Sequence, residues 1–257
     1  MRINRFKEKL TAFQPCSIAL ASWHDPVIEE MCGLAGIDAF LLDCEHGCIG
    51  DKEIAEYVRA CESSQIVPLL KLSEVNAARI QGYLDCGVMG LCIADVRCKE
   101  QAEQAVRAMK YAPLGERGIS TVRATGYGLR GSQSEEIEAA NKNTVLILMV
   151  ENKEAVDHLD EILSVPGVDS VTVGTSDLSA DLGHPGDRDH PEVLEAVKKV
   201  LLCARKHHIP VGTALRGNTS AREEYQNGFN SITCAIPGIL VQGLRRFAEQ
   251  MKECEGE

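Results

Sequence analysis

Eight short apolar runs alternate with longer amphipathic stretches along this 257-residue chain. Several runs are apolar at consecutive positions, which is typical of strands that are covered on both faces. Eight strands, each followed by a helix, make up a (β/α)8 barrel. The sequence therefore predicts an α/β fold, a single TIM-barrel domain over residues 1–257. Its predicted strands are SIALA (17–21), AFLLD (39–43), VPLLK (67–71), GLCIA (90–94), VLILMV (145–150), SVTVG (170–174), PVGT (210–213) and SITCA (231–235).

Charged side chains resume at or just after the ends of five successive runs. They are Asp43, Glu45, His46, Lys71, Asp95, Glu151 and Asp177. A barrel has its active site at the carboxyl ends of its strands, so we expect these residues to gather there. A doubly wound sheet would also bring ligands to carboxyl ends, and the pattern by itself does not exclude that fold.

Net charge and hydropathy limit the kinds of molecule that this protein is expected to bind. The formal net charge of −11 argues against nucleic acid or an anionic membrane, because both need a basic surface. The first residues, MRINRFKEKLTAFQ, carry charges throughout, unlike a signal peptide, and no segment has the ~18 apolar residues of a membrane span. We therefore expect a cytoplasmic protein that binds a small molecule and neither nucleic acid nor membrane.

The cysteines predict packing more than metal binding. Eleven cysteines are scattered through apolar segments without any C-x-x-C pair, which is typical of buried, reduced thiols. Cys44, His46 and Cys48 lie close enough in sequence to begin a zinc site. A structural zinc normally takes four protein ligands, however, and no second cluster of suitable spacing accompanies them.

Two acids at the ends of neighbouring strands suggest a metal site. Glu151 ends the most hydrophobic run, and Asp177 follows the next run after a turn of small residues. Adjacent strands lie ~4.8 Å apart, so both carboxylates can reach one cation. Oxygen ligands favour Mg²⁺ or Mn²⁺ over zinc. The alternative for Asp177 is a helix N-cap, and one residue can fill both roles.

Three further features are candidates for substrate binding or acid–base chemistry. The turn from Gly174 through Thr175 to Ser176 offers backbone N–H groups to a carboxylate or phosphate. His46 beside Glu45 and Asp43 suits a general base, because a carboxylate fixes its tautomer and raises its basicity.

The long glycine-rich segment 110–128 is the third feature, since loops of this length are usually functional. Arg117 and Arg123 in it are candidates to meet anionic groups, although surface arginines need no special role.

Four motifs in order, LLDCEHG, YAPLGERG with VRATGYG, LMVEN and VGTSDLSADLG, resemble the HpcH/HpaI family of class II, metal-dependent pyruvate aldolases. The 4-hydroxy-2-oxoheptanedioate aldolases are of this type. The resemblance runs from about residue 15 to at least residue 235. It implies a (β/α)8 barrel and a hexamer built as a dimer of trimers, in which the last helix packs against a neighbouring subunit.

The resemblance also implies roles for single residues. Glu151 and Asp177 would hold the divalent ion, which is Mg²⁺ or Mn²⁺, with Co²⁺ as a further candidate. The backbone around Gly174 and Ser176 would hold the pyruvate carboxylate.

His46 would be the base, and Asp85 would raise its basicity. Asp85 nevertheless ends a predicted helix on the far side of the barrel, and Asp43 is much closer to His46 in sequence. If Asp85 contributes, we expect it to reach the site of another subunit.

Two positions depart from the family pattern. Lys71 stands where the family usually has an arginine, so the positive charge remains but the planar two-donor fork is lost. Met149 stands where the family usually has a glutamine, which removes a polar contact to substrate or water. Both changes bear on substrate identity more than on fold or metal binding.

The sequence thus predicts a divalent-metal-dependent aldolase that reversibly cleaves a 4-hydroxy-2-oxo acid to pyruvate and an aldehyde. His46 would remove the 4-hydroxyl proton, and Lys71 would supply charge to the enolate. Three alternatives remain open: a Schiff-base aldolase at Lys71, a lyase for an acyl-CoA or another 2-oxo acid, and a non-catalytic protein that binds metal or a 2-oxo acid.

Overall fold

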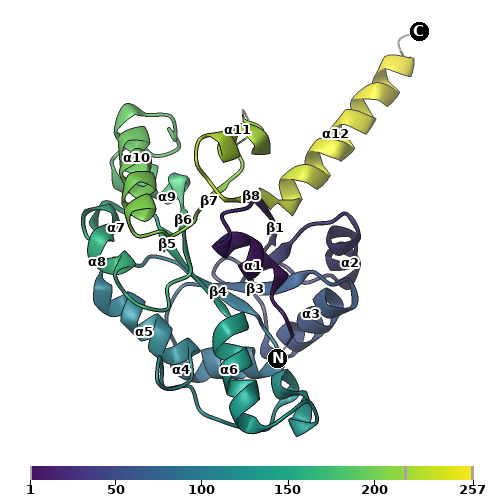
Figure 1. Ribbon diagram of the computed structural model, residues 1–257. Helices are drawn as coiled ribbons and strands as arrows, with labels where there is room; N and C mark the ends of the chain where they lie inside the picture. The colour runs from purple at the N-terminus through teal and green to yellow at the C-terminus, as the bar shows by residue number, and fades with distance from the viewer. Residues whose placement is uncertain (1, 217–218, 256–257) are drawn as a thin grey trace.

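The protein folds into a closed barrel of eight parallel strands in chain order, as Figure 1 shows for the computed structural model, which describes residues 2–216 and 219–255. The strands are β1 (Cys16–Ala21), β2 (Ala39–Asp43), β3 (Val67–Leu72), β4 (Gly90–Ile93), β5 (Val145–Val150), β6 (Ser170–Val173), β7 (Val211–Ala214) and β8 (Ser231–Ala235). Each coincides with a predicted run to within a residue at either end. Because β8 pairs with β1, the sheet has no edge, which confirms the TIM barrel and excludes the doubly wound alternative.

Most of the helices surround this barrel, while the first helix closes one end and the last projects away from it (Figure 1). The helices are α1 (Arg5–Thr11), α2 (Pro26–Leu34), α3 (Asp51–Ser63), α4 (Ala77–Cys86), α5 (Lys99–Met109), the 3₁₀ segment η1 (Arg123–Gly128), α6 (Gln133–Asn143), α7 (Lys153–Asp157), α8 (Leu159–Leu163), α9 (Thr175–Asp181), α10 (Pro191–Lys206), α11 (Ala221–Gln226) and α12 (Ile236–Glu255). The helix α3 illustrates their packing, since Ile54, Tyr57, Val58 and Cys61 recur at helical spacing and are all buried.

The strands alternate between two cores. In β2, Phe40 and Leu42 pack outward against the helices, whereas Leu41 packs inside the barrel. This period of two turns the last residue of the strand, Asp43, toward the interior. The same alternation in β3 turns Lys71 inward, and the register pairs Asp43 directly with Lys71. Strand geometry therefore sets charged residues at the inner carboxyl end.

The amino end of the barrel is closed by α1. Phe6 and Leu10 of this helix are buried among the residues that fill the barrel. Asn4 Nδ2 donates to the Met89 carbonyl at 3.1 Å, and Lys7 Nζ donates to the Thr144 carbonyl at 2.7 Å. Both acceptors directly precede strands, so α1 is tied to the end opposite the predicted site.

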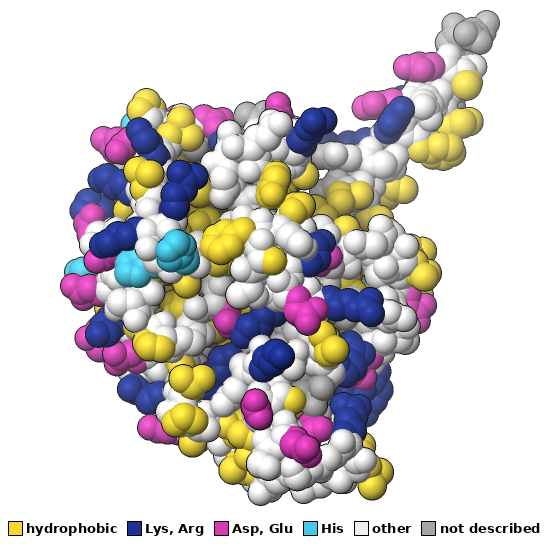
Figure 2. Space-filling view, viewed as in Figure 1, with side chains coloured by type: hydrophobic (Ala, Val, Ile, Leu, Met, Phe, Trp, Pro, Cys, Tyr) yellow, Lys and Arg dark blue, Asp and Glu magenta, His cyan; other side chains and the backbone are white. Residues whose placement is uncertain are grey.

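The last helix, α12, continues directly from β8 and projects away from the barrel (Figure 1). It has 20 residues and exposes apolar side chains along its length, which Figure 2 shows as a row of yellow atoms. No helix in the described part of the chain combines the length and apolarity needed to cross a membrane.

All eleven cysteines lie within the described residues and are free thiols. Cys16, Cys32, Cys61 and Cys92 are buried, as predicted for packing residues, whereas Cys48 and Cys254 are exposed. The cysteine pattern therefore reflects packing and not a disulfide framework.

Candidate active site

A cavity of about 240 Å³ lies at the carboxyl ends of the strands. All but two of the site residues predicted from the sequence line it. They are Asp43, His46, Lys71, Met149, Glu151, Gly174, Thr175, Ser176 and Asp177. The barrel thus brings together residues from four separate segments of the chain.

Glu151 is a buried carboxylate that follows the last residue of β5. Its Oε1 accepts a hydrogen bond from the backbone N–H of Asp95 at 2.7 Å, and only 7% of the residue is exposed. The pKa of Glu151 is raised to about 6, mainly by burial and to a smaller extent by the negative charge of Asp177, while the Asp95 hydrogen bond and the charge of Lys71 oppose the shift. A Cβ on Gly174 would lie 2.7 Å from Glu151 Oε2, so glycine leaves room for this carboxylate.

Asp177 lies in the first turn of α9, whose N-cap is Gly174. Asp177 is therefore not the helix N-cap that the sequence left open, and its carboxylate lines the cavity. A buried Glu151 and a more exposed Asp177 that repel one another form a donor set that a divalent cation would stabilise. Their oxygen ligands suit a hard ion such as Mg²⁺ or Mn²⁺.

Lys71 is held by two carboxylates. Its Nζ lies 2.7 Å from Glu45 Oε2 and 3.7 Å from Asp43 Oδ2. Burial alone would lower the pKa of Lys71, but the hydrogen bond to Glu45 and the charges of both acids raise it above its ordinary value. The side chain is therefore a fixed ammonium group in the cavity wall.

Asp43 organises the loop that carries His46. Its Oδ1 accepts hydrogen bonds from the backbone N–H groups of Glu45 and His46, both at 3.0 Å. The loop packs closely on the end of β1, since a Cβ on Gly47 would lie 2.4 Å from the Ser22 carbonyl oxygen. The His46 ring itself is largely exposed, and its Nε2 lies 3.5 Å from Glu45 Oε2. Asp43 thus positions the His46 backbone, while Glu45 is the acid nearest its ring.

Asp85 and Arg123 do not reach this cavity within one chain. Asp85 Oδ1 accepts a hydrogen bond from Arg117 Nη2 at 2.7 Å, and the Arg117 guanidinium lies 4.5 Å from the Tyr111 ring centre. Arg123 pairs with Glu62 and donates to the Cys86 carbonyl at 2.9 Å.

These contacts correct the substrate-binding assignment of Arg123 within a single chain, because its guanidinium is already used to join η1 to α3 and α4. They agree with the expectation that Asp85 lies away from its own site.

Comparison with known proteins gives the family. The model of the HpcH/HpaI aldolase/citrate lyase family matches residues 20–241. The chain belongs to this family. A hydroxypyruvate/pyruvate aldolase of Sagittula stellata is 33% identical over 96% of the chain and 97% of its own length. A 5-keto-4-deoxy-D-glucarate aldolase of Shigella sonnei is 30% identical over 97% of both chains.

A solved HpcH/HpaI aldolase from Desulfitobacterium hafniense DCB-2 has the same architecture. It superposes with a TM-score of 0.90 at 29% identity over 96% of each chain. This HpcH/HpaI protein is accordingly an aldolase or lyase of a family that generally depends on a divalent metal.

Two groups of three side chains that could bind a metal ion lie outside the active-site cavity. Among the described residues these groups are Asp160, Cys203 and His207, and His184, His190 and Glu192. Neither includes Cys44, His46 and Cys48, so the zinc reading of that stretch finds no support.

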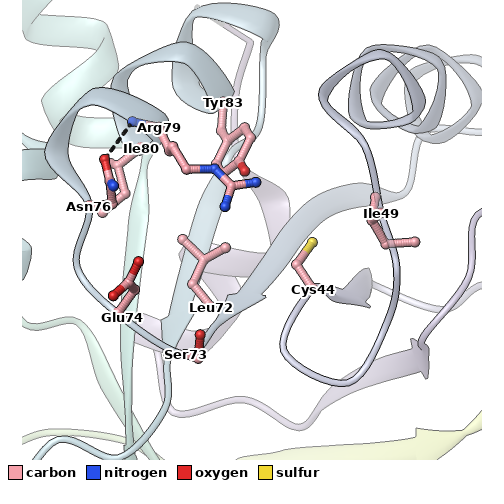
Figure 3. A pocket seen from close by; sticks show the side chains of 9 residues that line it. All are labelled: Cys44, Ile49, Leu72, Ser73, Glu74, Asn76, Arg79, Ile80 and Tyr83. Atoms are coloured by element: carbon pink, nitrogen blue, oxygen red, sulfur yellow. Dashed lines mark hydrogen bonds between the residues drawn. The ribbon is translucent and has the colours of Figure 1, made fainter.

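Cys44 in fact faces a second cavity of about 60 Å³ behind the His46 loop, together with Leu72, Arg79 and Tyr83 (Figure 3). Burial raises the pKa of its thiol to about 12, and Sγ contacts the Leu42 carbonyl at 3.8 Å. Cys44 is thus a protonated packing residue, while the preceding Asp43 faces the main cavity.

One backbone role and one side chain escaped sequence reasoning. Asp95 was expected at this end of the barrel for its charge, but it is its backbone N–H, at a positive φ of 49°, that supports Glu151. Arg188 lines the main cavity from the loop between α9 and α10. The stretch LGHPGDRDHP directly after the Asp177 motif was the available signal, because glycine-rich loops at this end of a barrel build its active site.

Proposed function

We propose that this protein is a divalent-metal-dependent aldolase that reversibly cleaves a 4-hydroxy-2-oxo acid to pyruvate and an aldehyde. The observation that carries the proposal is the buried Glu151 beside Asp177, in one cavity with His46 and Lys71. These side chains combine a metal-binding pair, a titratable base and a fixed cation.

Glu151 and Asp177 are the residues that would hold the ion, with Mg²⁺ or Mn²⁺ preferred and Co²⁺ as a further candidate. A bound divalent ion would act as a Lewis acid on the 2-oxo group and so stabilise negative charge on the pyruvate half. Gly174, Thr175 and Ser176 line the wall beside Glu151, where the pyruvate carboxylate is expected.

Lys71 supplies positive charge to the developing enolate. Its Nζ is oriented by Glu45 and Asp43, which reduces the reorganisation needed when the charge forms. An amine must lose its proton before it can attack a carbonyl, and the raised pKa of Lys71 opposes that loss. We therefore favour the electrostatic role over a Schiff base, and predict that borohydride with pyruvate does not trap Lys71.

His46 moves the proton of the substrate 4-hydroxyl group. The exposed ring can accept a proton and pass it to solvent, while Asp43 holds the loop and Glu45 lies close enough to orient the ring. Met149 lines the cavity close to Gly174, and its side chain gives this part of the wall an apolar surface.

We also propose a homo-oligomer, for which the family resemblance suggests a hexamer built as a dimer of trimers. On α12, Leu240, Leu244, Phe247 and Met251 recur every three or four residues and are all exposed. Such a stripe gains free energy when another copy covers it. The expected contribution of Asp85 to a second subunit depends on this assembly.

Light scattering tests the oligomer. Phe247→Glu should lower the molar mass of the particle, whereas Arg246→Glu on the same helix, as a matched control, should change it less. Identical masses for wild type and Phe247→Glu would count against a role for α12 in assembly.

Exchange of the pyruvate methyl protons in D₂O with added Mg²⁺ or Mn²⁺ tests the function. An aldolase of this type enolises pyruvate, so the methyl NMR signal should decrease without any aldehyde present. Metal and pyruvate binding without exchange would instead support the non-catalytic alternative.

A further inference from the structure

Arg188 brings a second cationic side chain to the cavity, from the loop 182–190 between α9 and α10. Lys71 and Arg188 are the lysine and the arginine among the described residues that line the cavity. Lys71 is neutralised at 2.7 Å by Glu45. The half-buried Arg188, in contrast, has no hydrogen-bond or ion-pair partner within residues 2–216 and 219–255.

The loop is fixed on the amino side of Arg188. The backbone N–H of His184 donates to the Ser179 carbonyl at 2.7 Å, and His184 Nε2 lies 2.9 Å from Glu192 Oε2. The His184 and His190 rings stack with their centres 3.4 Å apart. Parallel rings at this distance aim their nitrogens poorly at one ion, so the contacts describe an anchor for the loop.

The loop is also fixed on the carboxyl side. Asp189 Oδ1 accepts a hydrogen bond from Arg216 Nη1 at 2.7 Å, and Arg216 Nε donates to Glu224 Oε1 at 3.0 Å. Glu224 is fully buried. Arg188 therefore extends from a backbone that is held on both sides, and its position over the cavity is set by the fold.

We propose that Arg188 forms a second anion subsite, which binds a carboxylate on the aldehyde half of the substrate. This inference rests on the function proposed above, in which the pyruvate half lies against Glu151, Asp177 and Gly174. Those residues belong to strand ends and to the first turn of α9, whereas Arg188 belongs to the loop above them. The part of the substrate that extends from the barrel interior toward this loop is the aldehyde half.

The different chemistry of Lys71 and Arg188 supports separate roles for these two side chains. An arginine fork binds a carboxylate through two parallel hydrogen bonds, whereas the Lys71 ammonium is already occupied by two acids. The wall near the metal pair is acidic and would repel a second carboxylate without a matching cation. Arg188 would thus select aldehydes that carry an acidic group over neutral aldehydes of equal length.

Steady-state kinetics of pyruvate addition to two matched aldehyde pairs test this subsite. The pairs are 4-oxobutanoate with butanal, and glyoxylate with acetaldehyde, so that each pair differs in one carboxylate. Wild type should prefer the anionic member of at least one pair. Arg188→Gln should lower kcat/KM for that aldehyde by about 10-fold or more, mainly through KM, with little change for its neutral partner.

Two further variants and one partial reaction make the test decisive. Arg188→Lys should recover part of the preference, and Arg222→Gln, which removes an exposed arginine from α11, should keep it. Pyruvate proton exchange on the same samples reports the fold and the pyruvate half independently of any aldehyde.

The subsite is wrong if wild type exchanges protons without preferring an anionic aldehyde, or if Arg188→Gln keeps the preference. It is equally wrong if Arg188→Gln loses proton exchange, because Arg188 would then act on the pyruvate half or on the fold. Wild type without any exchange contradicts the proposed function itself.

Discussion

The amino and carboxyl ends of the barrel differ in how their buried charged groups are paired. At the amino end, Lys110 is 2% exposed, and its Nζ donates to the Thr144 carbonyl at 2.8 Å, to Thr144 Oγ1 at 3.0 Å and to the Asn141 carbonyl at 3.2 Å. Asp169 lies 2.8 Å from Lys7 Nζ and 3.8 Å from Lys110 Nζ. Burial lowers the pKa of Lys110 to about 8, so the group stays protonated at neutral pH.

At the carboxyl end, the acids outnumber the cations that face them. Lys71 is shared by Asp43 and Glu45. Burial raises the pKa of Glu151 to about 6, and the nearby charge of Asp177 acts in the same direction. The comparison shows that a buried charged group stabilises the fold where the same chain provides all of its hydrogen-bond and ion-pair partners. Where the chain leaves acids in excess, we propose that the charge serves to bind a ligand.

The largest expected effect is at the carboxyl end. Glu151→Gln removes one of the two acids that we propose to bind the metal, so metal-dependent pyruvate proton exchange should fall by about 100-fold or more. The thermal midpoint should stay unchanged or rise, because the buried acid is replaced by a neutral side chain. Exchange within twofold of wild type would contradict the comparison, and Glu195→Gln on the surface of α10 is the matched control.

The next effect is at the amino end and concerns stability. Lys110→Ala removes three hydrogen bonds of a buried side chain, to the Thr144 carbonyl, Thr144 Oγ1 and the Asn141 carbonyl, and it leaves a cavity. The Thr144 carbonyl keeps Lys7 as a donor, so we expect the free energy of unfolding to fall by about 2–4 kcal/mol. Urea unfolding measures it, and the exposed Lys142→Ala should cost much less. The rate of pyruvate proton exchange per folded molecule should stay the same. Loss of this exchange without loss of stability would contradict the structural role of Lys110.

A smaller expected effect is a pH dependence of stability that is caused by one more buried acid at the carboxyl end. Glu29 on α2 is fully buried beyond the end of β1, with Oε1 2.7 Å from His24 Nδ1 and Oε2 without a hydrogen bond to any described residue. Burial raises the pKa of Glu29 from 4.5 to about 7, against the opposing contact with His24.

Between these two pKa values the folded protein binds more protons than the unfolded chain, so stability should decrease as pH rises from 4.5 to 7. Glu29→Gln should remove this dependence and be more stable than wild type above pH 7 by about 1–3 kcal/mol. Unfolding curves at several pH values measure the difference. Parallel pH profiles for the two proteins would show that Glu29 does not titrate as described.

Much of the fold was predictable from the sequence because a buried parallel strand has little freedom in composition. VLILMV and AFLLD are apolar at nearly every position, and both became strands with the predicted bounds. The same strands carried the site residues, since a period of two and a fixed register place Asp43 beside Lys71.

The side-chain partners were not predictable in the same way. Arg123 was expected at the substrate but pairs with Glu62, 61 residues earlier in the chain, because the fold brings η1 against α3 and α4. Arg188 carries no hydrophobic periodicity and follows no strand directly. Its position depends on contacts such as that of Asp189 with Arg216, which only the folded loop reveals.

Binding of Mn²⁺, followed by electron paramagnetic resonance, tests most directly that the excess acids at the carboxyl end hold a divalent ion. Wild type should bind one Mn²⁺ per chain, Lys110→Ala should bind it equally well, and Glu151→Gln should bind it at least about 10-fold more weakly. Equal Mn²⁺ affinity in wild type and Glu151→Gln would contradict the account.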